Sequence, residues 1–342
     1  MSAPGLPVLV YGASGHTGRF VVAELIKRGH RPILAGRDPN RLKEVAGGEI
    51  RVAPLDASEA LDAALEGCAA VINCAGPFLD TAEPLIEAAL RARIPYLDVA
   101  AEQAYALDAF SRFGDAARQA ETPVLPAVAF YGGLGDLLAT VTLGDWTSAD
   151  RIEIAIALSS WRPTAGTRLT GQRNTAPRLM VREQTLQPIE TPAPQRRWAF
   201  PAPFGDQEVV ELSFTEMALI PRHLQSREVR SYFSTKPLAE LRDPDTPAPT
   251  AVDAKGRSDQ VFLLECVVTR GGARRRGWLT GQDIYAVTAP LVVSAAERAA
   301  ELKVGGVFAP GEIFDAYEFL SSLSPEPFRL HLEEPRSEPA RR

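Results

Sequence analysis

The sequence predicts a doubly wound α/β fold of the Rossmann type, followed by a second α+β domain built on a largely antiparallel sheet. Short apolar strands alternate with helices over residues 8–129, and a glycine-rich turn follows the first strand. Near residue 150 the pattern changes to strands that alternate apolar and polar residues. Continuously apolar strands separated by helices are typical of a parallel sheet that is covered on both faces.

The elements of the first domain follow from this alternation. We expect helices over 18–28, 58–65, 83–93 and 110–121, with a further helix that begins over 40–45. Ser58 is a candidate N-cap because its hydroxyl could accept a backbone N–H. The six expected strands cover 8–11, 32–35, 50–54, 70–74, 96–99 and 123–129.

The second domain is expected where the periodicity changes. Residues 151–159 alternate as a half-buried strand does, and 261–269 with 275–280 predict a hairpin through Gly271-Gly272. Helices predicted over 289–302 and within 310–323 are expected to return to the first domain. The predicted domains are 1–146 with 283–325 for the nucleotide, 147–282 for substrate binding and dimerisation, and 326–342 as a tail.

Composition limits the function classes. The 342 residues are 45% hydrophobic and 23% charged, with a net charge of −6. An acidic chain lacks the basic field that general nucleic-acid or anionic-membrane binding needs. No apolar run approaches the roughly 18–20 residues of a membrane span, and no signal peptide is expected. The cluster Arg274–Arg276 fits a solvated turn better than a phosphate site.

Cysteine and histidine usage predicts a reducing compartment and no metal site. The three cysteines, Cys68, Cys74 and Cys266, lie far apart, which fits a reducing compartment. The four histidines are scattered, so no metal-ligand spacing is present. They are His16, His30, His223 and His331.

The glycine-rich turn predicts a dinucleotide site. It reads Gly12-Ala-Ser-Gly-His-Thr-Gly18, directly before a predicted helix. Backbone N–H groups in such a turn reach a diphosphate, and the helix dipole favours its charge. Ser14 and Thr17 add hydroxyls, and Gly15 is the middle glycine. His16 is expected to pack beside the nicotinamide or the diphosphate, with proton transfer as the alternative role.

The residue at the end of the second strand predicts the choice of cofactor. Arg37 stands nineteen residues after Gly18, where an acid would bind the ribose of NAD and a guanidinium accommodates the 2′-phosphate of NADP. We therefore expect NADP(H), although Asp38 is adjacent. Arg41, in the next helix, is included in this site. Asp56, after the third strand, either bonds the adenine amino group or serves only its own turn.

Further candidates follow the later strands. The turn Asn73-Cys-Ala75-Gly76-Pro77 is small enough for close approach of the nicotinamide half, and a plain strand-to-helix connection is the alternative. All four of Asn73, Ala75, Gly76 and Pro77 are counted as cofactor-binding residues.

Five residues are candidates for contact with the substrate. Asp98 and Glu102 either orient a cationic or hydroxylated substrate, or Asp98 caps the following helix. Tyr131, on a glycine-rich turn, either donates a proton after hydride transfer or acts as a wedge between domains. His16 is the second candidate proton donor. Tyr285 lines the cleft or packs at a hinge.

Two more polar residues come from the stretch 160–250, which contains no readable motif. They are Arg173 and His223, and surface loops explain both equally well. No Tyr-x-x-x-Lys pair follows the fourth strand, and neither a Gly-x-Ser-x-Gly motif nor a Cys–His nucleophile is present. Hydride transfer is therefore the leading chemistry.

Several of these segments together resemble the saccharopine dehydrogenase-like oxidoreductases, which include saccharopine reductases and trans-acting enoyl reductases. The chain departs from that family at His16, where an aromatic residue is usual, and at Ala129–Gly132, near the expected active site. The resemblance implies an NADP-binding fold, a cytoplasmic enzyme and a homodimer formed through the sheet of the second domain. The matching segments are 11–19, 34–38, 71–78 and 96–102, with weaker likeness at 281–288 and 306–311.

The sequence thus favours an NADP(H)-dependent oxidoreductase acting on a small organic substrate held between the two domains. Carbonyl, imine and conjugated C=C acceptors all remain open. Two other hypotheses stand beside it. One is a non-catalytic sensor of NADP(H), and the other is a synthase that reduces an imine formed from an amine and an aldehyde.

Overall fold

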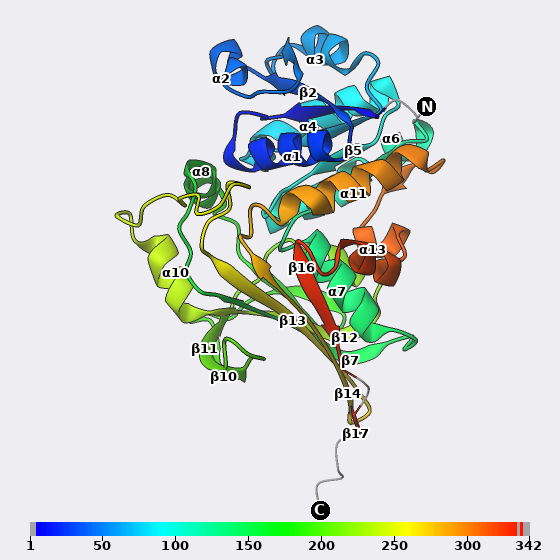
Figure 1. The fold of residues 1–342 in the computed structure, drawn as a ribbon. Helices are drawn as coiled ribbons and strands as arrows, with labels where there is room; N and C mark the ends of the chain where they lie inside the picture. Colours follow the sequence, from blue (N-terminus) through cyan, green and yellow to red (C-terminus); the bar gives the residue numbers. More distant parts are fainter. Residues whose placement is uncertain (1–4, 334–335, 338–342) are drawn as a thin grey trace, which may run out of the picture. The chain divides into compact units, whose positions relative to one another are not determined.

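The computed structural model describes residues 5–333 and 336–337, which form two compact units. Unit 1 comprises Met1–Ala129, Thr164–Asn174 and Thr288–Phe308. Unit 2 comprises Phe130–Pro163, Thr175–Val287 and Ala309–Arg342. Both units are therefore discontinuous in sequence, and Figure 1 follows the chain through them. These units divide the chain at other residues than the predicted domains do, so the predicted boundaries stay a prediction.

Unit 1 is built on a seven-stranded parallel sheet, which confirms the predicted Rossmann-type fold. The order is β3-β2-β1-β4-β5-β6-β15, so the nucleotide-binding order of six strands gains one strand at its end. Nearly all residues of β1, β2, β4, β5 and β6 are buried, as the apolar runs predicted. The strands are β1 Pro7–Tyr11, β2 Arg31–Gly36, β3 Glu49–Val52, β4 Ala70–Asn73, β5 Tyr96–Asp98, β6 Pro123–Leu125 and β15 Gly306–Val307.

The helices of unit 1 lie between these strands, with two additions from later in the chain. Ser58 is the first residue of its helix and Ala57 occupies the cap position without a side-chain bond, so the expected Ser58 cap is wrong by one residue. The helices are α1 His16–Lys27, α2 Pro39–Lys43, α3 Ser58–Leu65, α4 Phe78–Ala92, α5 Gln103–Arg112, α6 Gly114–Gln119, α8 Ala165–Arg173 and α11 Thr288–Glu301.

Helix α11 packs beside α1, as expected for a segment that returns to the nucleotide-binding sheet. Arg28, just after α1, donates to Glu297 and Ser294 of α11, each at 2.8 Å. His30 Nε2 lies 2.6 Å from the other oxygen of Glu297. One carboxylate of α11 therefore fixes the connection between α1 and β2.

Unit 2 contains a ten-stranded sheet that is mostly antiparallel, again as predicted. Its main order is β10-β11-β12-β7-β13-β14-β16, and among the strands of the described residues only β7 and β12 pair in parallel. The predicted hairpin is β13–β14, and its turn residues Gly271 and Gly272 have φ of 55° and 82°. Two positive φ values are the reason this turn takes Gly-Gly.

The strands of unit 2 are β7 Ala149–Leu158, β8 Leu179–Arg182, β9 Thr185–Pro188, β10 Gln195–Ala199, β11 Asp206–Glu211, β12 Ser226–Ser234, β13 Val261–Arg270, β14 Ala273–Gln282, β16 Phe328–Leu332 and β17 Arg336–Ser337. The helices are α7 Gly133–Leu143, α9 Glu216–Leu219, the 3-10 helix η1 Ile220–Arg222, α10 Thr235–Arg242, α12 Pro310–Ile313 and α13 Ala316–Leu323.

Two C-terminal elements differ from expectation. Helix α13 belongs to unit 2, where it packs against α7 and β16, and does not return to the nucleotide-binding sheet. The segment expected to be a tail from residue 326 contains β16, which pairs with β14. Phe328 is fully buried, so an apolar anchor draws this segment into the sheet. Residues 334–335 and 338–342 of the expected tail lie outside the described residues.

Candidate functional site

The glycine turn after β1 depends on three residues without side chains. Gly12 has φ of +79°, and a Cβ on it would lie 2.9 Å from the Cβ of Ala75, in the turn after β4. A Cβ on Gly18 would lie 2.3 Å from the carbonyl oxygen of Gly12. Gly15 is less constrained, at 3.1 Å from the same oxygen. These contacts let α1 start directly beneath the turn.

The start of α1 fits the diphosphate of a dinucleotide. Gly15 is the N-cap residue and forms no side-chain cap, which leaves the first turn of this 12-residue helix facing the glycine turn. Such a helix end attracts an anion through its N–H groups and its dipole. Ser14 and Thr17 are half-buried in the same turn. His16 packs edge-on against Phe20, with ring centroids 5.3 Å apart.

The two residues after β2 take different roles. Asp38 caps α2, since its Oδ1 accepts from the N–H groups of Asn40 at 2.9 Å and Arg41 at 3.3 Å. Arg37 is exposed, and it forms no ion pair or hydrogen bond with other residues of the described ranges. Asp56 is exposed after β3.

Tyr11 shows that Arg37 and Asp56 lie near the same point of unit 1. Burial raises the pKa of Tyr11 to about 12, while the charge of Arg37 lowers it and that of Asp56 raises it. The phenol donates to the carbonyl of Ala53 at 2.9 Å. The ends of β1, β2 and β3 therefore bring the predicted adenosine-binding residues together.

Asn73 shapes the turn after β4 from inside the unit. Its side chain is fully buried, and its Oδ1 accepts from the N–H of Ala75 at 2.9 Å. Its Nδ2 donates to Thr81 at 3.3 Å and to the phenol of Tyr96 at 3.2 Å. The hydrogen bonds of Asn73 thus lie inside the unit, and one of them fixes the turn that contains Ala75, Gly76 and Pro77.

The predicted substrate carboxylate Asp98 is also used internally. It is fully buried, and its Oδ1 accepts from the N–H groups of Ala100 at 3.0 Å and Ala127 at 2.8 Å. Its Oδ2 accepts the hydroxyl of Tyr105. Burial raises the pKa of Asp98 to about 6, and these hydrogen bonds oppose the rise. Asp98 holds the ends of β5 and β6 together rather than capping α5.

Glu102 has the same kind of role one turn later. It is 1% exposed, its Oε1 accepts from the N–H of Phe78 at 2.9 Å and its Oε2 from that of Ala101 at 3.1 Å. Phe78 is the first residue of α4, so the carboxylate lies at the positive end of that helix. Burial raises the pKa of Glu102, while the backbone hydrogen bonds lower it.

Tyr131 and Tyr285 come together in unit 2 around an aromatic cluster. The ring of Tyr131 stacks on Phe214 with centroids 4.1 Å apart, and Trp161 stacks on Phe233 at 5.1 Å. Trp161 Nε1 donates to the phenol oxygen of Tyr285 at 3.3 Å. Sequence reasoning found the two tyrosines but missed the rings between them, because these come from separate strands and loops.

The phenol of Tyr131 is buried, and it forms no hydrogen bond among the residues that the structure describes. Burial raises the pKa of this phenol well above its usual value, the charges of Tyr285 and Glu216 raise it further, and Arg178 lowers it. Glu216 is itself buried and accepts from the N–H of Phe214 at 3.0 Å. No pattern in the sequence marked Glu216 or Arg178.

The two other polar candidates are each bound to a carboxylate, in different units. His223 Nε2 lies 2.8 Å from Oδ1 of the buried Asp136 of α7, in unit 2. Burial disfavours the charged imidazole, but Asp136 outweighs burial and raises the pKa of His223. Arg173 pairs with Asp80 in unit 1.

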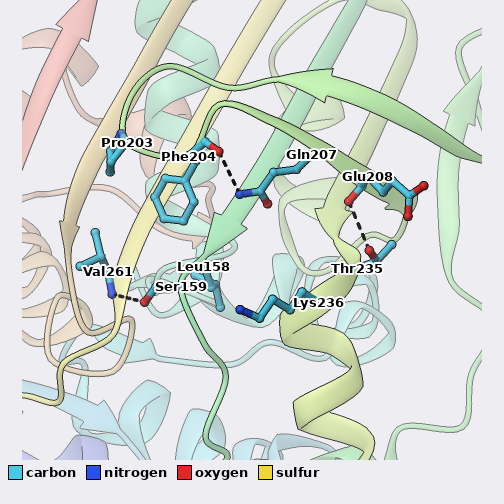
Figure 2. Close-up of a pocket in the computed structure, with 9 residues that line it drawn as sticks. All are labelled: Leu158, Ser159, Pro203, Phe204, Gln207, Glu208, Thr235, Lys236 and Val261. Carbon is cyan, nitrogen blue, oxygen red and sulfur yellow. Dashed lines mark hydrogen bonds between the residues drawn. The ribbon is translucent and has the colours of Figure 1, made fainter.

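A groove of about 560 Å³ opens on unit 2, and Figure 2 shows its walls. The ring of Phe204 and the side chains of Leu158 and Val261 form its apolar part. The polar part includes Lys236, at the start of α10, and Gln207, whose Nε2 donates to the carbonyl of Phe204 at 3.2 Å. Six of its nine lining residues come from the stretch 160–250, in which the sequence showed no motif.

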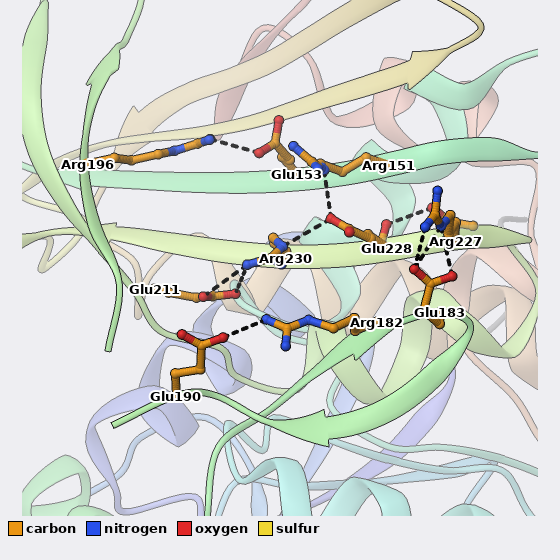
Figure 3. Close-up of polar contacts among 11 residues, drawn as sticks. Arg151, Glu153, Arg182, Glu183, Glu190, Arg196, Glu211, Arg227, Glu228 and Arg230 are labelled. Atoms are coloured by element: carbon orange, nitrogen blue, oxygen red, sulfur yellow. Dashed lines mark hydrogen bonds and ion pairs between the residues drawn. The ribbon is translucent and has the colours of Figure 1, made fainter. Parts of the chain in front are cut away.

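Charged side chains of β7, β8, β10, β11 and β12 are joined in ion pairs (Figure 3). Arg196 pairs with Glu153 at 2.9 Å, and Arg230 bridges Glu228 at 3.2 Å and Glu211 at 3.3 Å. Five arginines face five glutamates, so this group presents no excess of one sign. The remaining pairs are Arg151–Glu228, Arg182–Glu190 and Arg227–Glu183.

No group of three or more His, Cys, Asp or Glu side chains in residues 5–333 and 336–337 could hold a metal ion. Within the same ranges, every helix is too short or too polar to cross a bilayer.

Comparison with known proteins connects this geometry to a family. A family model described as NAD(P)H-binding matches residues 12–113. A probable mitochondrial saccharopine dehydrogenase-like oxidoreductase of Arabidopsis thaliana is 26% identical over 185 residues, 48% of this chain and 41% of that protein. Saccharopine dehydrogenase (L-Glu forming) of Saccharomyces cerevisiae superposes with a TM-score of 0.68 at 13% identity, covering 96% of this chain and 99% of that one. The chain resembles the saccharopine dehydrogenase-like oxidoreductases.

The saccharopine dehydrogenase-like resemblance predicted from the motifs is thereby confirmed, and the chain has an NAD(P)-binding oxidoreductase fold. Cinnamoyl-CoA reductase 1 of Arabidopsis thaliana is 34% identical over 110 residues, 30% of this chain and 32% of that protein. The matches thus span less than half of either curated relative. DAP dehydrogenase of C. glutamicum shares the fold with a TM-score of 0.52 at 12% identity, over 95% of this chain and 99% of that one.

The pKa of Asp98 predicts a pH-dependent stability. Because the folded pKa is about 6 and the ordinary value is 3.8, the stabilisation tied to the neutral carboxyl is fully present below the ordinary value and is lost as the pH rises through about 6. Asp98→Asn should therefore gain stability relative to the wild type between about pH 4 and pH 7. Urea unfolding followed by circular dichroism measures this. Asp62→Asn, on the surface of the same unit, is the control, and an equal pH dependence in Asp98→Asn and wild type would contradict the assignment.

Proposed function

We propose that the protein is an NADP(H)-dependent oxidoreductase that transfers hydride to or from a small organic substrate. The observation that carries the NADP choice is the contrast between Arg37 and Asp38. The carboxylate of Asp38 caps α2, whereas the guanidinium of Arg37 is exposed and unpaired among the described residues. The guanidinium of Arg37, at the end of the second strand, suits the 2′-phosphate of NADP. The carboxylate of Asp38 already accepts hydrogen bonds from α2, so it is not expected to bind the ribose hydroxyls of NAD.

The remaining candidate cofactor residues are assigned to different parts of the nucleotide. Gly12, Gly15 and Gly18, with the start of α1, bind the diphosphate, and Ser14 and Thr17 add hydroxyl donors. When bound, NADP(H) would supply or accept the hydride. Arg41 is proposed to support Arg37, and Asp56 to bind the adenine. His16 is proposed to pack at the glycine turn. Ala75, Gly76 and Pro77 are proposed to face the nicotinamide half of the nucleotide.

Tyr131 is the proposed proton donor. Its buried hydroxyl has no hydrogen-bond partner among the described residues, which supports a hydrogen bond to a substrate atom. Tyr285 holds Trp161 beside it. We assign Asp98 and Glu102 a positioning role, because their oxygens hold the backbone of the strand ends.

An imine is the first acceptor to test. Solved proteins of this fold include saccharopine dehydrogenase, DAP dehydrogenase and an amine dehydrogenase of Mycobacterium smegmatis, which covers 90% of this chain and 95% of that one with a TM-score of 0.50 at 9% identity. Their names point to substrates with a carbon–nitrogen bond. A cytoplasmic location belongs to the proposal, and the free thiols of Cys68, Cys74 and Cys266 support a reducing compartment.

Arg37→Glu tests the cofactor assignment. Loss of a charge-assisted bond and introduction of a repelling carboxylate should raise the Kd for NADPH at least about tenfold, while the Kd for NADH changes little. Fluorescence titration of both nucleotides measures this, with Arg93→Glu as an exposed control in unit 1. Equal losses for the two nucleotides would overturn the NADP preference, and failure of the wild type to bind either would overturn the proposed function.

Tyr131→Phe tests the proton donor. Removal of the hydroxyl should lower kcat about a hundredfold or more with an imine or carbonyl substrate, while NADPH affinity is retained. Steady-state kinetics and titration on the same preparation separate the two effects. Tyr285→Phe should have a smaller effect on kcat. An unchanged kcat in Tyr131→Phe would remove Tyr131 from the mechanism.

A homodimer is also part of the proposal, supported by one face of the sheet in unit 2. Trp278 of β14 stacks on His331 of β16 with centroids 5.0 Å apart, and its ring stays partly exposed. A Cβ on the neighbouring Gly277 would face Leu138 and Thr142 of α7, so Trp278 lies on the opposite face. A partly exposed aromatic ring on a sheet face is typical of an association surface.

Sedimentation velocity tests the dimer. We expect a species of twice the chain mass of 36.9 kDa, and Trp278→Glu should shift it toward monomer because a carboxylate would be desolvated in the interface. Glu333→Lys, beyond the end of β16, is a control that should leave the mass unchanged. A wild-type monomer at micromolar concentration would contradict the proposal.

A further inference from the structure

Gln260 is a buried residue, 4% exposed, that lies just before β13 in unit 2. Its Nε2 donates to the carbonyl oxygen of Ser160 at 2.7 Å, and its Oε1 accepts from the N–H of Ile284 at 3.0 Å. Ser160 directly precedes Trp161 in the chain. Ile284 likewise directly precedes Tyr285. One side-chain amide therefore connects the backbone next to the indole with the backbone next to the phenol.

The loop that bears Tyr285 has a second anchor in Asp283. This residue is fully buried, and its Oδ1 accepts from the N–H of Tyr285 at 2.9 Å. Its Oδ2 accepts from the N–H of Ser258 at 2.7 Å. The N–H of Asp283 in turn donates to the backbone carbonyl of Gln260 at 2.8 Å. The backbone at Tyr285 is thus fixed to residues 258–260.

The backbone of Trp161 is anchored as well, and its indole contacts the phenol directly. The N–H of Trp161 donates to Oε2 of Glu240, in α10, at 2.7 Å. The indole Nε1 donates to the phenol oxygen of Tyr285 at 3.3 Å. A hydrogen bond weakens as its atoms separate. The spacing of the two backbones, to which Gln260 is bound on both sides, therefore controls this contact.

This pair of aromatic residues lies beside the proposed proton donor. The rings of Trp161 and Tyr131 have centroids 6.0 Å apart. Burial raises the pKa of the Tyr131 phenol and the charge of Tyr285 raises it further, so the two phenols lie near each other. Misplacement of a catalytic group by about 1 Å can cost about a hundredfold in rate.

We infer that Gln260 is a positioning residue: it holds Trp161 and Tyr285 at the separation that orients the proposed proton donor. The amide suits this role because it donates to one loop and accepts from the other, which no single apolar or charged side chain of its length does at neutral pH. This inference rests on the proposed function and on the role assigned there to Tyr131.

The test uses Gln260→Met, which keeps the length of the side chain and removes both hydrogen bonds. Gln207→Met is the control, because Gln207 also donates from Nε2 to a backbone carbonyl of unit 2, that of Phe204 in Figure 2. Far-ultraviolet circular dichroism and the melting temperature establish that each variant folds. If Gln260→Met does not fold, Gln260→Glu replaces it, because a carboxylate still accepts from Ile284 but cannot donate to Ser160.

Near-ultraviolet circular dichroism tests the position of the indole without nucleotide or substrate. The chain contains four tryptophans, so the signal of Trp161 is the difference between each protein and the same protein carrying Trp161→Phe. We expect this signal to change in Gln260→Met and to keep its wild-type shape in Gln207→Met. An unchanged Trp161 signal in Gln260→Met would overturn the inference.

Steady-state kinetics test the consequence for catalysis, with the same imine or carbonyl substrate that tests Tyr131→Phe. We expect Gln260→Met to lower kcat about three- to tenfold, the range that one hydrogen bond provides, while KM and the Kd for NADPH change less than about twofold. Gln207→Met should keep the wild-type kcat. In a Tyr285→Phe background, Gln260→Met should lower kcat less than about twofold, because effects that pass through one shared contact are not additive.

The outcomes separate this inference from the proposed function. If the Trp161 signal changes but kcat of Gln260→Met stays at the wild-type value, the aromatic pair does not orient the donor and the inference fails. It fails as well if Gln260→Met lowers kcat by the same factor with and without Tyr285→Phe. In both cases the oxidoreductase assignment stands. If the wild type binds neither NADPH nor NADH, the proposed function is overturned, and the role of Gln260 in that reaction with it.

Discussion

The absence of two side chains, those of Gly12 and Gly18, is the constraint on which the nucleotide-binding unit depends. With Cβ atoms at these positions, the turn after β1 would collide with the turn after β4 and with its own carbonyl oxygen. To avoid these collisions, the backbone of the turn would have to shift, and the start of α1 would move away from the end of β1. Since a helix dipole acts only within about its first turn, such a shift would remove the anion site along with the packing. Fold and site therefore share one steric requirement.

A second feature unites the residues that follow the strands of unit 1. Asn73 and Asp98 are the last residues of β4 and β5, and Glu102 follows β5. Each side chain accepts hydrogen bonds from backbone N–H groups at this edge of the sheet. Buried polar side chains that are fully hydrogen-bonded make such loops rigid. The nucleotide edge of the sheet is thus held by side chains that face inward, and its ligand contacts come from backbone and small residues. This arrangement explains how a turn such as Ala75–Pro77 stays in place without side chains of its own.

Sequence reasoning reached the fold because apolar runs and glycine spacing are local signals. It predicted the parallel sheet, the hairpin at Gly271-Gly272 and the return of α11. It could not anticipate that α13 joins unit 2, or that Phe328 draws a strand out of the expected tail, because the partners of both segments lie far away in sequence. Its candidates Arg37 and the glycines of the turn rest on the same kind of local signal, and they stay predictions. It offered Asp98 and Glu102 as substrate contacts, with helix capping as the alternative for Asp98, because a carboxylate near a strand end looks the same in sequence whether it faces a ligand or the backbone. Glu216 and Arg178 gave no signal, since only the folded chain brings them to Tyr131.

The interleaved course of the chain has a consequence for biosynthesis. The sheet of unit 1 lacks its edge strand until residues 306–307 have been made, and that of unit 2 lacks β16 until 328–332 follow. Contacts between such distant residues are slow to form, and incomplete sheets expose unpaired strand edges. A nascent chain would therefore carry two unfinished sheets at once until residues 306–307 and 328–332 have both been synthesised. Chaperone dependence during translation is the expected cost of this topology.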